Sequence, residues 1–263
     1  MRFLAKLGVI ALAIFQICSG QEKAPPLRTI RLLAVGDPPS FRQEIRDGVR
    51  YEVAPPKGSV PPVKVEVSAV NGEGVEQKSE YELKNAAKPG LRLKLNQIST
   101  RLSVPDVELN IRLIEEGRSW HHLRLPEGGD FLVVLWRDPK VKNWSKARSI
   151  LVKDGGPDFQ AGDLRCINVS PADLGFMFGE KDRFEVAGGQ TVFKSLGISE
   201  GIPTRVMYQG PKGRWQRLWS SALVQNRGER STVVVYFADG KKPRKPVKLI
   251  TLRDRALPFP RAK

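Results

Sequence analysis

The sequence predicts an all-β protein made of two tandem antiparallel β-sandwich domains that arose by internal duplication. Three observations lead to this prediction: short segments alternate apolar and polar residues, pairs of glycine or proline separate them, and the same order of segments occurs twice. Successive side chains of a strand point to opposite faces of a sheet, so strict alternation indicates a half-buried strand. Many short strands separated by such turn signals are typical of sandwiches and barrels.

Alternation is clearest in residues 63–67, 91–95 and 107–113, where Val, Leu or Ile occupies every second position. We expect these three segments to be strands with one face in a core. Residues 131–136 and 232–237 are apolar at nearly every position and are expected to be central strands, buried on both faces. No long segment has the period of a helix.

Four segments of the first half match four segments of the second half in the same order. The matched pairs are 31–35 with 165–169, 51–54 with 184–187, 133–138 with 234–239, and 150–154 with 250–254. The offsets are 134, 133, 101 and 100, because the first half has a longer middle segment. Chance similarity among β-rich segments is the alternative explanation. Duplication predicts one domain at 27–154, a second at 160–255 and a flexible tail at 256–263.

Residues 1–20 have the layout of a secretory signal peptide. Arg2 and Lys6 precede an apolar run at 7–15, and the small residue Gly20 marks the expected cleavage site. The run is too short to span a bilayer, so no transmembrane segment is expected after cleavage. Lipid attachment at Cys18 is the alternative, although a small residue would then be expected just before it. We expect an exported protein that is periplasmic, cell-surface or secreted.

The chain is strongly basic, with a formal net charge of +16, which falls to +14 when Arg2 and Lys6 leave with the signal peptide. Such an excess of positive over negative side chains favours anionic partners. An exported protein is not expected to meet nucleic acid, so an anionic polymer or surface of the cell envelope is the expected partner. Cys166 would then be the one remaining thiol, and its alternating apolar surroundings predict that it is buried and inert.

Two basic segments occupy matching places between the last two predicted strands of each half. Their residues are Lys140, Lys142, Trp144, Lys146 and Arg148 in the first half, and Lys241, Lys242, Arg244 and Lys245 in the second. Cations beside an aromatic ring can bind anionic polymers by charge and stacking. The alternative is that lysine-rich turns keep strand edges soluble and unpaired.

These features predict an exported, non-enzymatic binding or structural module of the cell envelope that contacts anionic polymers through its paired basic loops. The alternative is an assembly subunit that binds a partner protein by sheet-edge or sheet-face contacts. Three tryptophans, Trp120, Trp215 and Trp219, could stack on sugar rings, but such residues more often fill the core of a sandwich.

Catalysis and metal binding have little support in the sequence. His121 and His122 are the only histidines, and adjacent residues of a strand point to opposite faces, so the two rings are not expected to share a metal ion. Neither a G-x-S-x-G elbow nor a phosphate-binding loop occurs. We therefore predict no cofactor, no metal site and no enzymatic activity, with a hydrolase as the least favoured alternative.

One motif of the second half carries a family resemblance. Residues 164–171 end in Asn168-Val169-Ser170-Pro171, and Gly188-Gly189 follow after a short strand. This arrangement resembles exported bacterial immunoglobulin-like β-sandwich domains of unknown function. The resemblance implies an immunoglobulin-like sandwich and export, and it brings no catalytic residues with it.

Overall fold

The computed structural model describes residues 26–70, 90–141, 143–180, 182–197, 199–210, 212–239 and 243–256. These residues form strands and turns without any helix, so the prediction of an all-β fold is confirmed. Within the same ranges no helix is long and apolar enough to cross a membrane. The predicted signal peptide, Cys18 and residues 257–263 of the predicted tail lie outside the described residues.

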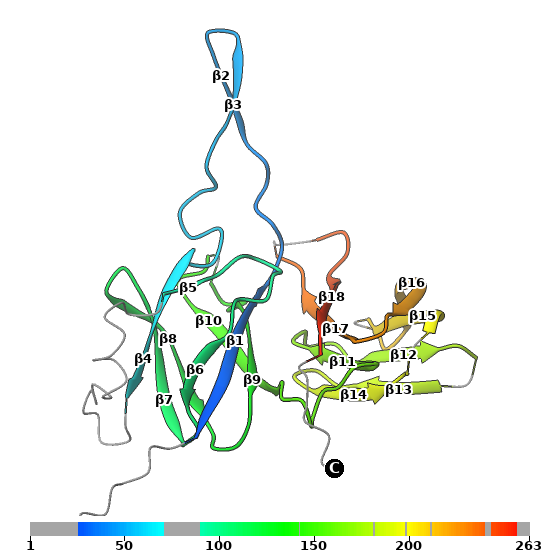
Figure 1. Cartoon of the computed structure of the whole chain (residues 1–263). Coiled ribbons are helices and arrows are strands. Elements are labelled where there is room, and N and C mark those ends of the chain that lie inside the picture. The colour runs from blue at the N-terminus through cyan, green and yellow to red at the C-terminus, as the bar shows by residue number, and fades with distance from the viewer. Residues whose placement is uncertain are drawn as a thin grey trace, which may run out of the picture.

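The first half of the chain forms two four-stranded sheets that face each other (Figure 1). We call one the first inner sheet, and its strands in spatial order are β10 (Ala147–Lys153), β9 (Phe131–Arg137), β1 (Leu27–Val35) and β6 (Leu102–Pro105). The first outer sheet contains, in order, β5 (Gly90–Arg92), β4 (Lys64–Val70), β7 (Leu109–Glu115) and β8 (Arg118–Leu125).

The second half also forms two four-stranded sheets. The second inner sheet contains β14 (Thr191–Ser195), β11 (Asp163–Asn168), β17 (Glu229–Phe237) and β18 (Val247–Arg255). The second outer sheet contains β13 (Asp182–Val186), β12 (Leu174–Phe178), β15 (Ser199–Gln209) and β16 (Trp215–Gln225).

The strand order of the second half repeats that of the first. β11, β17 and β18 pair with one another as β1, β9 and β10 do, and the outer sheets match in the same way. Val134 lies opposite Ile150, and Val234 lies opposite Ile250. Equivalent positions of β9 and β17 are therefore 100 residues apart. The sequence match pairs Val133 with Val234, an offset of 101, so it is shifted by one residue.

Two sequence expectations differ from the structure. β1 pairs with β9 in parallel, and so does β11 with β17, so the sheets are not purely antiparallel. Each pair is parallel because the chain crosses to the outer sheet and returns between its two strands. The matched segments 51–54 and 184–187 are not equivalent either, since 184–187 belongs mainly to the outer-sheet strand β13 while Tyr51 lies in a separate hairpin.

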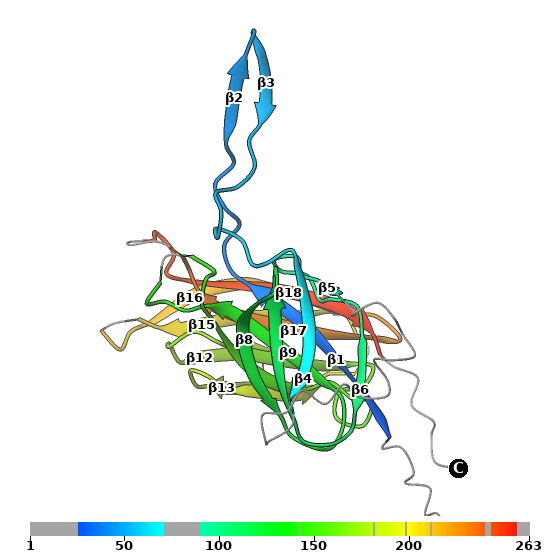
Figure 2. The ribbon, with the colours of Figure 1, turned by 90° about the vertical axis from the view of Figure 1, so that its left-hand side faces the viewer.

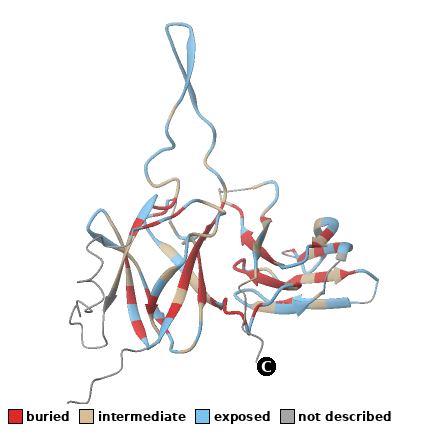
Figure 3. Ribbon diagram, viewed as in Figure 1, coloured by how far each residue is buried: buried red, intermediate tan, exposed pale blue. Residues whose placement is uncertain are grey.

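Each half has its own core, and a third core joins the halves. Leu32 and Val133 face the core inside the first half, whereas their neighbours Leu33 and Val134 face the second inner sheet. The partners across that boundary include Val234. The central strands β1, β9, β11 and β17 are therefore buried on both faces over most of their length, which explains their continuous apolar sequence (Figure 3).

A hairpin projects from the first half, and we call it the arm (Figures 1 and 2). It consists of β2 (Gln43–Arg46) and β3 (Val49–Glu52), and every residue of the two strands is exposed. The turn between them is Asp47-Gly48, both at positive φ, as a tight two-residue hairpin turn requires. Among the described residues, nothing packs over the arm to cover its apolar side chains (Figure 3).

Candidate binding site at the shared end of the two halves

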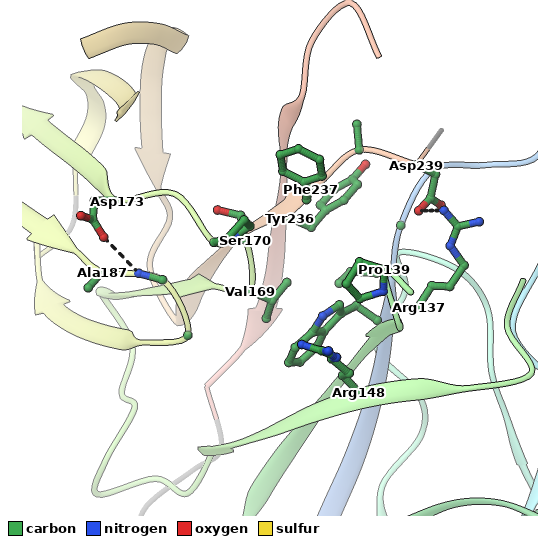
Figure 4. A pocket seen from close by; sticks show the side chains of 17 residues that line it. Arg137, Pro139, Arg148, Val169, Ser170, Asp173, Ala187, Tyr236, Phe237 and Asp239 are labelled. Carbon is green, nitrogen blue, oxygen red and sulfur yellow. Dashed lines mark hydrogen bonds and ion pairs between the residues drawn. The ribbon is translucent and has the colours of Figure 1, made fainter. Parts of the chain in front are cut away.

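The two predicted basic segments emerge at the same end of the molecule. Loop 1 (residues 138–146) connects β9 to β10, and loop 2 (residues 238–246) connects β17 to β18. Their bases meet across the boundary between the halves, where Arg137 Nη2 donates to Asp239 Oδ1 at 2.5 Å (Figure 4). The matching position of the loops in the two halves therefore brings them together in space.

The described cations of both loops face solvent. The exposed cations at or beside loop 1 and loop 2 are Lys140, Lys146, Arg148, Arg244 and Lys245. Lys142, Lys241 and Lys242 lie outside the described residues. Arg148 is held loosely, because its Nε lies 3.4 Å from Asp138 Oδ1 and 48% of its side chain is exposed.

Trp144 does not serve as an exposed aromatic of loop 1, because it is only 2% exposed. Its backbone N–H donates to the Gly58 carbonyl at 2.7 Å, and its own carbonyl accepts from Trp120 Nε1 at 2.6 Å. Its ring also lies against Gly36, where an added Cβ would meet it at 3.4 Å. Trp144 thus fixes loop 1 to the segment that follows the arm, and the expectation that it stacks on a ligand is wrong.

A pocket of about 700 Å³ lies between the two loops and between the two halves. Figure 4 shows side chains of both halves facing each other across it. They include Trp136, Pro139 and Arg148 from the first half and Asp173, Phe237 and Asp239 from the second.

Two polar groups in the pocket wall have altered acidity. Burial and the nearby Asp37 raise the pKa of Tyr236, so its phenol stays protonated and donates to Asp37 Oδ1 at 3.2 Å. Burial also raises the pKa of Asp239, the Arg137 guanidinium opposes this, and the Asp37 carboxylate adds to it. The wall therefore combines carboxylate acceptors with a guanidinium group and aromatic rings.

Asp37 anchors the segment that precedes the arm to the second half. Its carboxylate accepts from the Tyr236 hydroxyl, from the backbone N–H of Asp239 at 3.0 Å, and from Lys248 Nζ at 2.9 Å. Since Trp144 holds the segment that follows the arm, both ends of the arm are fixed beside the two loops. The arm, the loops and the pocket consequently share one end of the molecule.

A buried charge cluster lies at the opposite end of the inner sheets, and the sequence analysis missed it. Arg31 forms a fork with Asp154 at 2.6 and 2.8 Å and reaches Asp254 at 2.6 Å. Arg165 donates to Asp154 at 2.9 Å, and Arg230 donates twice to Asp254 at 3.1 Å. The signal was present, because Arg31 matches Arg165 and Asp154 matches Asp254 in the repeated segments.

The charge cluster contains three guanidinium groups and two carboxylates. Burial alone would raise the pKa of Asp154, but the hydrogen bond from Arg31 and the charges of Arg165 and Arg230 hold it below the ordinary value. Burial lowers the pKa of Arg165 to about 10. The Arg165 and Arg230 guanidinium groups lie 4.2 and 4.6 Å from the centre of the Phe159 ring, which supplies a cation–π partner to each.

The other residues considered in the sequence have structural contacts. His121 Nε2 bonds with the Ser149 hydroxyl at 2.9 Å, whereas His122 Nε2 bonds with the Ser119 hydroxyl at 2.8 Å. The described residues contain no cluster of three or more metal-ligating side chains. Cys166 is buried as expected, and burial raises the pKa of its thiol.

Two of the three tryptophans pack against the cores. Trp120 contacts the first core and Trp219 the second. Trp215 remains 43% exposed, with its ring over Gly175, where an added Cβ would lie 3.3 Å from it. None of the three lines the pocket between the halves.

The Asn-x-Ser-Pro motif is a buried turn. The Asn168 amide donates to the carbonyls of Ala172 at 2.7 Å and Val186 at 3.0 Å. Its carbonyl oxygen accepts from the Ser170 hydroxyl at 2.7 Å and from the Ser170 backbone N–H at 3.0 Å. Asn168 therefore satisfies backbone groups where the chain leaves β11 and enters β12.

The sequence matches no known protein-family model, and no curated protein matches it either.

Proposed function

We propose that this protein is an exported, non-enzymatic binding module of the cell envelope that holds an anionic polymer across the end formed by loops 1 and 2. One observation carries the proposal: the Arg137–Asp239 ion pair at 2.5 Å brings the bases of both basic loops together. Two loops that match in sequence position but lay at opposite ends would not support a shared binding surface.

Charge supports a polymer over a small anion. Exposed charges interact over about 8–10 Å at physiological salt, so the cations of adjacent loops act on the same stretch of a polyanion. Each contact is weak, but a chain that meets both loops gains from their simultaneous engagement. Binding of this kind is sensitive to salt, which makes it easy to recognise.

We also infer that the two halves are copies of one immunoglobulin-like sandwich. The matching strand order and the offset of 100 between β9 and β17 support this inference. Two facing antiparallel-rich sheets in about 100 residues are typical of that architecture. Duplication would have supplied two equivalent loops at once, and burial of the inner faces against each other would have placed them side by side.

Retention of the purified mature protein on immobilised polygalacturonate tests the function. We expect retention that decreases as salt rises, and elution without delay from a column of neutral galactan. Elution without delay from both columns at low salt would show that the high net charge serves solubility alone, and it would refute the proposal.

Charge reversal locates the binding surface. One variant carries Lys146→Glu and Lys245→Glu, one substitution in each loop. The matched control carries Arg227→Glu, in the turn before β17, and Arg255→Glu, at the end of β18; both residues are exposed and lie at the end of the second inner sheet away from loop 2. Both variants have the same net charge, so only the first is expected to elute at much lower salt. Equal elution of the two variants would mean that net charge, not the paired loops, causes retention.

The arm supports a second candidate function, assembly with a partner protein. An isolated two-stranded hairpin is marginally stable in water, yet this one exposes Ile45, Val49 and Tyr51, and Phe41 just before it is exposed too; each side chain is about half exposed or more. A photo-crosslinking residue at Ile45, compared with one at the exposed Val107, tests the idea in native envelopes. A single protein neighbour captured only from Ile45 favours assembly, and equal or no capture from both sites opposes it.

A further inference from the structure

The pocket between the halves has the size and position of a small-ligand site. Its volume of about 700 Å³ lies within the range of about 300–1,000 Å³ found for such sites, which occur preferentially at domain boundaries. Pro139 of loop 1 and Ala238 and Asp239 of loop 2 line it, so a polymer that lies across both loops also lies beside the pocket. The pocket therefore can take a unit of that polymer while the rest stays on the surface.

Aromatic side chains line both sides of this pocket. Trp136 comes from the end of β9, and Phe237 comes from the end of β17 and is 46% exposed. The phenol of Tyr236 is already engaged with Asp37, so its ring is held in place. Flat apolar faces with polar groups beside them suit a ligand that has both apolar and polar sides, such as a sugar ring.

Arg148 is the cation of the pocket that is best placed to accept a new partner. Arg137 is committed to Asp239 at 2.5 Å, whereas Arg148 Nε lies 3.4 Å from Asp138, beyond a good charge-assisted hydrogen bond. A guanidinium group offers two parallel N–H donors that match the two oxygens of a carboxylate. A ligand carboxylate at Arg148 would thus replace a weak ion pair with a stronger one.

The acidic side chains of the pocket restrict which anion fits. Asp239 and Asp173 both line it, and Asp173 Oδ1 is only weakly engaged, 3.4 Å from the Gly188 backbone N–H (Figure 4). Two carboxylates repel a densely charged group such as phosphate. They accept hydrogen bonds from hydroxyl groups, however. A ligand with one carboxylate and several hydroxyls can therefore pair with both the guanidinium group and the carboxylates of the pocket.

We propose that this pocket binds a hexuronate unit, with its carboxylate on Arg148, its ring against Trp136 and Phe237, and its hydroxyls on Asp173 and Asp239. The inference rests on the proposed function, since it identifies the acidic sugar polymer as the ligand class of the same end of the molecule. It adds a site of defined shape to a surface that otherwise selects by charge alone.

Isothermal titration calorimetry with trigalacturonate tests the pocket separately from the loops. The titration is made at a salt concentration that elutes the protein from long polygalacturonate, so that loop contacts contribute little. We expect saturable binding of trigalacturonate and none of neutral galactotriose. Arg148→Gln should weaken binding about tenfold, the loss expected for one charge-assisted hydrogen bond, and Arg148→Lys should restore part of it.

Matched variants separate a pocket effect from a general one. Phe237→Ala should also weaken binding several-fold, whereas Arg124→Gln and Phe193→Ala, which remove an exposed cation and an exposed aromatic ring away from the pocket, should leave it unchanged. Equal affinity of the pocket variants Arg148→Gln and Phe237→Ala and of the two control variants would overturn the proposal, and so would displacement of trigalacturonate by inorganic phosphate at similar concentrations. Retention on the long polymer without any trigalacturonate binding would refute the pocket and leave the proposed function standing. Failure of both would refute both.

Discussion

Replacing Asp154 with asparagine removes one of two carboxylates that balance three buried guanidinium groups. The side chain of Asp154 is 3% exposed and accepts from Arg31, Arg165 and Arg230 at distances of 2.6 to 3.4 Å. Asn keeps the shape but not the charge, so Asp254 alone would face three buried cations. Breaking a buried ion pair by removing one partner typically costs about 3–5 kcal/mol.

Urea unfolding followed by tryptophan fluorescence measures the effect. With a denaturant dependence of about 2 kcal/mol per molar, the midpoint of Asp154→Asn should fall by about 2 M. Asp254→Asn should cost less, because its side chain is 19% exposed and partly compensated by water. Glu108→Gln is the control, since it breaks an exposed pair with Arg124 and should change stability by less than about 0.5 kcal/mol.

The same substitution should change the response of stability to acid. The pKa of Asp154 is lower in the folded protein than in the unfolded chain, so its contribution is fully present above about pH 4 and disappears as the pH falls below that value. Asp154→Asn should therefore flatten the loss of stability below about pH 4. A midpoint and an acid response no different from those of Glu108→Gln would refute the assignment of Asp154 as the centre of the cluster.

Three further predictions concern other parts of the fold. The Cys166 thiol should react with a disulfide reagent only when the protein unfolds, because it is 1% exposed; rapid reaction of the native protein would contradict the buried position. Asn168→Ala should lower the free energy of unfolding by about 2–3 kcal/mol in the urea assay, because buried backbone carbonyls lose their donor. Replacing Phe41 and Ile45 with serine should leave the urea midpoint nearly unchanged, as both side chains are about two-thirds exposed, and a drop above about 1 kcal/mol would show that the arm packs on the body.

The central strands β9 and β17 of the inner sheets could be predicted because nearly all of their residues are apolar. Residues 131–136 and 232–237 match β9 and β17 closely, since an inner strand has apolar neighbours on both faces. The sequence could not show that the second face of each strand meets the other half. That contact depends on residues about 100 positions apart, such as Val134 and Val234, whose proximity leaves no local trace.

The candidate site was predictable in part. Matching loop positions were readable from the repeat, but their convergence depends on a contact between Arg137 and Asp239 that spans the two halves. Trp144 was misjudged because polar neighbours suggested an exposed loop, whereas packing against Gly36 and bonding to Gly58 draw its ring inside. The arm had a local signal in Asp47-Gly48, a dipeptide that favours two-residue hairpin turns.

The sharing of a core between the inner sheets limits how the protein can be divided. Either half produced alone would present Leu33 and Val134, or Ile167 and Val234, to water as part of a continuous apolar face. Surfaces of that kind lead to aggregation, however well each half folds around its own core. We therefore expect that cutting the chain between β10 and β11 yields insoluble fragments. The smallest part of this protein that can be expressed in soluble form is the pair of halves joined together.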